Sequence, residues 1–181
     1  MIQHMWTVIC RDSSVDRDTS NITLFRVFAH LQISLPKPPP NPAAKGVIAP
    51  CDFHVVTCWG RSDTGEASSG KARMTLSNPE GETLLVQEYH VDLTQSVQHH
   101  QRSMMKQLPL TSGGRYRFCV DRMEASGEWE SMTTAPLDVD IRWTDEKNVP
   151  YELVKTPANS SSTEPEQKGG GSGVMRPKAR I

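Results

Sequence analysis

Apolar and polar residues alternate one by one in the middle of the chain. Every second residue of 71–77 is apolar, which is the period of a strand with one buried face. Residues 78–81 read Asn-Pro-Glu-Gly, with proline and glycine where a type I turn favours them. A further apolar run follows over 83–93. These three segments predict a β-hairpin.

The same alternation returns over 115–121 and 137–143. A Gly-Gly pair precedes the first segment, and the turn before the second includes Trp129. Alternation with one apolar and one polar side is typical of antiparallel sheets whose second face is solvated. We therefore predict that these two strands pair in a loose antiparallel hairpin.

The N-terminal half shows three further strand patterns. We predict a short strand over 5–10, one long strand over 23–35 with a bend near Phe28, and a strand over 53–59. In the long strand the apolar residues keep one phase, and both faces become apolar at the bend. Because these apolar residues recur at every second position, we predict that they all face the same core.

Residues 94–108 fit two patterns, an amphipathic helix and an edge strand with a polar face. No convincing helix cap precedes the segment, and its neighbours are strands. We therefore favour the strand.

Six of the chain's 13 prolines lie within residues 36–50. Proline fixes φ and lacks the amide that a sheet ladder uses, so this stretch predicts an exposed polyproline-II crossover between two sheets. A ligand for a proline-recognition groove is the alternative. We favour the connector.

The patterns together predict an all-β fold, a single antiparallel β-sandwich of immunoglobulin-like or related topology over residues 5–145. Its Pro-rich crossover loop spans 36–52. Residues 156–181 are mainly Pro, Ser, Glu, Lys and Gly, so we expect a disordered C-terminal tail. The Gly/Ser piece in this tail is typical of a flexible linker, natural or engineered.

Charge and hydropathy narrow the class of protein. Residues 1–154 carry 15 basic and 19 acidic residues, the opposite of a basic nucleic-acid-binding body. No apolar stretch approaches the about 18 residues that span a bilayer, and the first residues lack the features of a secretory signal. We expect a cytoplasmic protein that binds neither nucleic acid nor membrane. Its four cysteines are then expected to be thiols.

Metal binding is the first chemistry that the residues suggest. Cys51, His54 and Cys58 lie close in sequence, and His99 and His100 could add ligands. On an extended strand, however, residues four apart are about 13 Å from each other, too far to share one ion. We predict no metal and no cofactor.

The sequence carries no recognised catalytic signature. The Gly-x-Ser-x-Gly elbow, the phosphate loop and the dinucleotide fingerprint do not occur. Asp138 and Asp140 lie on one strand face, but Arg142 continues the same row, which indicates an ordinary solvated face. With four cysteines and six histidines, Cys–His pairs are expected by chance. We predict that the chain is not an enzyme.

Two tryptophans and a proline run are the candidate binding residues. Trp59 and Trp129 lie at the ends of predicted strands, where they could form a stacking platform for a sugar or cap the core. Capping is the favoured interpretation. The possible binding surface comprises Trp59, Trp129, Pro38, Pro39 and Pro40.

Four segments carry a resemblance to a known family. They are 7–12 (Thr-Val-Ile-Cys-Arg-Asp), 21–28 (Asn-Ile-Thr-Leu-Phe-Arg-Val-Phe), 74–81 (Met-Thr-Leu-Ser-Asn-Pro-Glu-Gly) and 114–120 (Gly-Arg-Tyr-Arg-Phe-Cys-Val). Their order resembles that in the bacterial proteins grouped as domain of unknown function 6941, over about residues 5–143. The resemblance implies a small β-sandwich without an assigned activity. The Pro-rich crossover departs from the family's compact pattern, and so does the C-terminal tail, in which basic residues outnumber acidic ones.

The leading functional hypothesis is a non-enzymatic module that binds another protein through an exposed sheet edge or the crossover loop. The alternative is a small-molecule or carbohydrate-binding module that uses Trp59 and Trp129. A thiol- or metal-dependent enzyme is a distant third. The identity of the partner, the oligomeric state and the strand order do not follow from the sequence.

Overall fold

The computed structural model describes residues 1–16, 19, 21–36, 44–61, 68–144 and 152–155, and within them all regular structure is β. None of the described segments is a long apolar helix that could cross a membrane. The strands are β1 (Ile2–Val15), β2 (Ile22–Val27), β3 (His30–Pro36), β4 (Ala44–Arg61), β5 (Ser69–Ser77), β6 (Thr83–Asp92), β7 (Gln98–Leu110), β8 (Gly114–Met123), β9 (Trp129–Thr144) and β10 (Glu152–Lys155).

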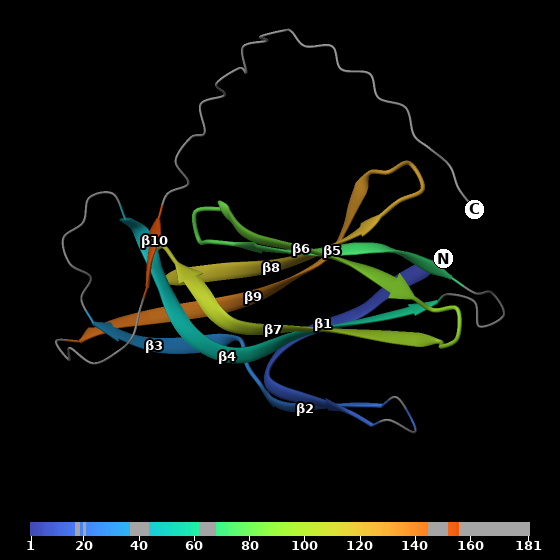
Figure 1. The fold of residues 1–181 in the computed structure, drawn as a ribbon, viewed down its shortest axis with the longest axis horizontal. Coiled ribbons are helices and arrows are strands. Elements are labelled where there is room, and N and C mark those ends of the chain that lie inside the picture. The colour runs from blue at the N-terminus through green and yellow to red at the C-terminus, as the bar shows by residue number, and fades with distance from the viewer. Residues whose placement is uncertain (17–18, 20, 37–43, 62–67, 145–151, 156–181) are drawn as a thin grey trace, which may run out of the picture.

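The strands form two five-stranded sheets (Figure 1). In sheet A, the long strand β4 pairs with β7 along one side and with β1 and β10 along the other, and β2 lies beyond β1. Sheet B has the order β3-β9-β8-β5-β6. The predicted pairing of β5 with β6 and of β8 with β9 is confirmed, and so is the strand in 94–108, which is part of β7. The loose connection predicted between β8 and β9 is wrong, because β9 begins at Trp129, directly opposite Met123.

The prediction of a purely antiparallel fold is wrong at one pair, because β3 runs parallel to β9. The single strand predicted over 23–35 is in fact two strands in different sheets. Phe28 donates its amide to Ile9 of sheet A, whereas the carbonyl of Ala29 accepts from Asp138 of sheet B. The chain therefore changes sheets between these two residues, and a strand that crosses over in this way can enter the second sheet in parallel.

The predicted crossover loop over 36–52 is also too long at its C-terminal end, because β4 begins at Ala44. Pro50 lies within this strand, opposite Gln107 of β7. The register between β4 and β7 shifts directly after it, and a β-bulge tolerates a residue that has no amide to donate. The proline run 38–40 and the predicted tail 156–181 lie outside the described residues.

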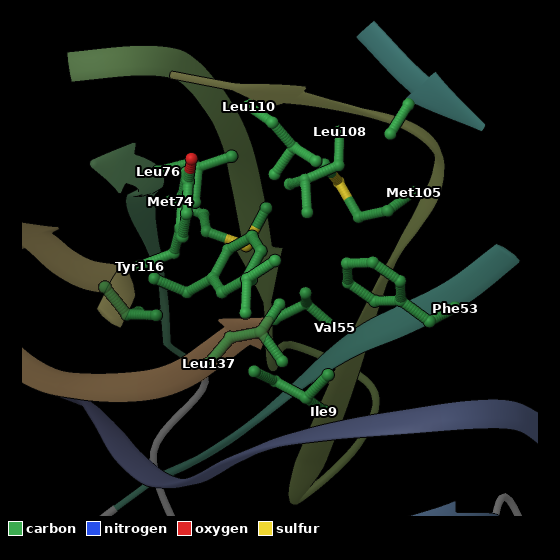
Figure 2. Close-up of a cluster of buried hydrophobic side chains, with 14 of the residues drawn as sticks. Ile9, Phe53, Val55, Met74, Leu76, Met105, Leu108, Leu110, Tyr116 and Leu137 are labelled. Carbon is green, nitrogen blue, oxygen red and sulfur yellow. The ribbon is translucent and has the colours of Figure 1, made fainter. Parts of the chain in front are cut away.

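One hydrophobic core lies between the two sheets, an arrangement that fits a β-sandwich (Figure 2). Sheet A contributes Phe53 and Val55, and sheet B contributes Leu76 and Phe118. The Phe53 ring meets the Phe118 ring edge to face, with centroids 6.2 Å apart, a favoured aromatic geometry. Alternate residues of β4, β5 and β8 thus supply the core, as the period of two predicts.

Polar side chains fix the turns at one end of sheet B. The buried Tyr116 donates its hydroxyl hydrogen to the carbonyl of Ser112 over 2.9 Å and accepts the amide of Thr111 over 3.0 Å. Asn78, also buried, accepts the amide of Glu82 and donates to the Thr111 hydroxyl. These bonds tie the turn between β5 and β6 to the loop between β7 and β8, because buried polar groups are stable only when they are paired.

Candidate functional site

The outer face of sheet A, which points away from the core, holds a second group of buried residues. Cys10, Val56 and Cys58 are fully or almost fully buried, yet they do not belong to the core cluster. Directly opposed residues of an antiparallel pair share a face, so the register gives the side chains around them. Their neighbours on this face are Trp6, Val8, Val27, His54, His100, Arg102 and Met104.

Several large apolar side chains on this face are open to solvent. Val27 is 61% exposed, Met104 59% and Phe25 48%. The half-buried Trp6 and Val8 continue the surface on β1. We call these five residues the outer apolar patch. The second face of an antiparallel sheet is normally polar, so a face with large exposed apolar side chains on both β2 and β7 indicates an interaction surface.

Rings from the two strands that flank β4 cover Cys58. The Trp6 ring on β1 and the His100 ring on β7 lie with their centroids 5.8 Å apart, and Cys58 is the residue opposite both in the register. Burial raises the pKa of the Cys58 thiol to about 11. Burial, followed by the charge of Asp12, also raises the pKa of Cys10. Both sulfurs therefore serve as apolar packing under the patch.

A polar group centred on His54 lies between the β1 and β7 parts of the patch. The Ser13 hydroxyl lies 2.8 Å from Nδ1 of His54, and an Asp12 carboxylate oxygen lies 3.8 Å from the same nitrogen. The guanidinium of Arg102 donates to the carbonyl of Ser13. Hydrogen-bonding groups beside apolar side chains are usual in protein interfaces.

Backbone strain accompanies the exposed part of β2. Arg26, between Phe25 and Val27, has a φ of 53°. This left-handed conformation costs a residue other than glycine roughly 1–2 kcal/mol. Strained backbone of this kind is found preferentially at functional segments, and here it lies between the two exposed apolar residues of β2.

The two predicted tryptophans do not form one surface. Trp59 is fully buried in the core, so it offers no ring to a ligand in solution. Trp129 is half-buried on the outer face of sheet B, where the Arg73 guanidinium lies 4.5 Å from its ring centroid. A shared sugar platform of Trp59 and Trp129 is therefore excluded by their positions. Pro38, Pro39 and Pro40 lie outside the described residues.

Three histidines gather at the end of sheet A near Trp59. His4 meets the Trp59 ring edge to face at 5.4 Å, His99 is the register partner of Trp59, and His100 packs on Trp6. Burial lowers the pKa of each of them below the ordinary value of 6.5. Among the described residues, no group of His, Cys, Asp or Glu is arranged to hold a metal ion.

These histidines predict that acid destabilises the protein well before its carboxylates titrate. Since the folded-state pKa values lie below 6.5, the unfolded chain takes up protons first as the pH falls. The free energy of unfolding should be highest above about pH 7 and should decrease between about pH 7 and pH 5. Urea unfolding at pH 7.5, 6.0 and 5.0 measures this decrease.

A His99→Gln variant is the control, since it should show a shallower decrease over the same interval. The carboxyl groups with a lowered pKa, such as Asp52 and Asp138, lose their contribution only below about pH 5, so they do not interfere. A free energy of unfolding that stays constant from pH 7.5 to 5.0 would contradict the burial of these rings.

The sequence matches no protein-family model and no curated protein. Membership of the family that it resembles therefore stays a prediction.

Proposed function

We propose that the chain is a non-enzymatic protein-interaction module, a β-sandwich of immunoglobulin-like or related topology that binds a partner protein through the outer apolar patch. The observation that carries this proposal is the exposure of Phe25, Val27 and Met104 on a sheet face that already buries Cys10, Val56 and Cys58. A partner that covers the patch would remove this apolar surface from water.

The pairing of the strands supports the immunoglobulin-like topology. Strands β5, β8 and β9 pair as the C, F and G strands of that fold do, with β6 in the place of C′, and β4 pairs with β7 as B pairs with E. Tyr116 near the start of β8 bonds back to Ser112, as in a tyrosine corner. Phe118 and Phe53 meet where antibody domains link strands B and F by a disulfide.

The shape and composition of the patch favour a protein over a small ligand. Small-molecule sites are concave and enclose most of their ligand, whereas the outer apolar patch extends across β2, β1 and β7 on one sheet face. Tryptophan, phenylalanine and methionine are enriched in the centres of protein interfaces. The proposed partner therefore presents an apolar surface of its own.

The thiols support a non-catalytic function. Burial raises the pKa of both Cys51 and Cys58 to about 11. A nucleophilic or metal-binding cysteine needs a lowered pKa, because the thiolate is the reactive form. These two sulfurs are protonated at neutral pH, so the proposal assigns them no reaction.

Charge substitutions in the patch test the proposal. We expect Val27→Lys and Met104→Lys each to reduce recovery of a stoichiometric protein partner from a lysate of the source cells by about tenfold or more. The control is Val86→Lys on β6, because Val86 is 51% exposed but belongs to sheet B. Affinity purification with quantitative mass spectrometry measures the recovery.

Unchanged urea midpoints would show that the three variants fold alike. If both patch variants recover the same partners as the wild-type chain, the outer apolar patch is not the binding surface. An equal loss in Val86→Lys would likewise contradict the proposal, because it would show a response to added charge anywhere on the surface.

A further inference from the structure

A groove of about 280 Å³ runs along β3. Its lining includes the consecutive residues 31–35 of β3 and 50–53 of β4, together with Arg11 and Phe28. Side chains of a strand alternate between two faces, so a surface that touches five residues in a row follows the backbone edge of β3. The groove therefore opens onto the strand's main chain.

The edge of β3 that faces away from β9 has backbone groups without partners among the described residues. Ala29 accepts the amide of Asp138 through its carbonyl, and Leu35 accepts the hydroxyl of Thr144 through its carbonyl. Since the backbone groups of successive strand residues point to opposite edges, the odd positions face β9. The even positions Gln32 and Ser34 therefore direct their amides and carbonyls to the other edge. In the described sheet β3 is the end strand and pairs with β9, so no described strand bonds to this second edge.

The opposite wall of the groove is the bulge of β4. Asp52 in this bulge already forms an ion pair with Lys106, with Nζ and Oδ1 2.6 Å apart. The hydrogen bond from Lys106 lowers the pKa of Asp52, and the charge of Arg11, exposed on β1, lowers it further. Two cations against one carboxylate leave this wall with an excess positive charge, which is complementary to an acidic side chain.

We propose that the groove binds an extended, acidic segment of a partner protein, which adds as a new strand to the free edge of β3. The main chain of the segment bonds to Gln32 and Ser34, and an Asp or Glu side chain of the segment faces Arg11. The groove is lined by none of the five residues of the outer apolar patch, so this proposal does not depend on the function proposed for that patch.

Hydrogen exchange on the full chain with a synthetic peptide tests the proposal. The probe is the octapeptide Thr-Val-Thr-Glu-Val-Thr-Val-Thr. At saturating peptide, we expect the amides of Gln32 and Ser34 to exchange about tenfold more slowly. Unchanged exchange at millimolar peptide, or protection confined to other edge strands, overturns the proposal.

Two variants separate backbone from side-chain recognition. Ser34→Pro removes the free-edge amide, which an edge strand tolerates, and should weaken peptide binding about tenfold. Ser34→Ala keeps the amide and should bind as the wild type does. Equal binding by both variants overturns the proposal. If Ser34→Pro does not fold, a peptide with alternate N-methylated amides replaces it and must fail to bind the wild-type chain.

The proposed contact between Arg11 and the glutamate of the peptide is tested by removing each charge in turn. Arg11→Gln should bind the glutamate peptide several-fold more weakly than the wild type does. The same peptide with Gln in place of Glu should bind wild type and Arg11→Gln equally. An Arg11→Gln variant that keeps full affinity for the glutamate peptide overturns the charge assignment. The outer-patch variant Met104→Lys on β7 should leave all of these affinities unchanged, which separates a failure here from a failure of the proposed function.

Discussion

Trp59→Ala is expected to lower the free energy of unfolding by about 3–5 kcal/mol, the range for removal of a large aromatic side chain from a core. Trp59 is fully buried in the cluster that both sheets share, and its ring meets the edge of His4 at 5.4 Å. Alanine leaves a cavity between the sheets that rigid strands on both sides cannot close. Urea unfolding at pH 7.5 measures the decrease.

Trp129→Ala is the matched control, because it removes the same side chain from a half-buried position on the outer face of sheet B. The main specific interaction that this substitution removes is the one with the Arg73 guanidinium, 4.5 Å from the ring centroid. A cation–π interaction of this kind contributes about 0.5–1 kcal/mol at an exposed site. Equal decreases in the two variants would contradict the placement of Trp59 in the core.

Local pattern is enough to predict the two hairpins. Every second residue is buried from Ala72 to Leu76 of β5 and from Tyr116 to Val120 of β8, and each strand is followed along the chain by its antiparallel partner. Pairing of strands adjacent in sequence needs only a turn between them, and the Asn-Pro-Glu-Gly turn supplies it. The alternation and the turn residues therefore predict the β5–β6 hairpin fully, whereas for β8 and β9 they predict the pairing but not the start of β9 at Trp129.

The outer apolar patch could not be predicted in the same way. A period of two separates the two faces of a strand, but it does not tell which face meets the core. The apolar residues of β2 and β3 keep one phase along the chain, yet Val27 is exposed on sheet A while Ile33 is buried in sheet B. The sequence signal for this change is the apolar character of both faces at Phe28, which marks the crossing between the sheets.

The groove along β3 depends on pairings between distant segments. Its free edge exists because β3 joins β9, more than 100 residues later in the chain. Its opposite wall exists because β4 bulges against β7 directly after Pro50. Proline indicates an interruption of the ladder, but the sequence does not distinguish an interruption by a loop from an interruption by a bulge.

Gly46→Ala should produce the second large decrease, about 3 kcal/mol in the free energy of unfolding. A Cβ at Gly46 would overlap with the carbonyl oxygen of Leu110 and would lie 3.2 Å from the Cα of Thr111. Both are backbone atoms, at the last residue of β7 and at the residue after it, so no side-chain rotation relieves the overlap. The pairing of Val47 with Leu110 would have to open, and both residues belong to the core.

Gly60→Ala, at the other end of β4, separates this clash from a general effect of alanine. The added Cβ would lie 3.2 Å from the Met5 sulfur and 3.3 Å from its Cγ. Met5 is an exposed, flexible side chain that can move aside, so the decrease should stay below about 1 kcal/mol. Chemical unfolding of both variants gives the comparison. If Gly46→Ala is no less stable than Gly60→Ala, the close approach of β4 and β7 at Leu110 is wrong, and the part of the core between β4 and β7 must pack differently.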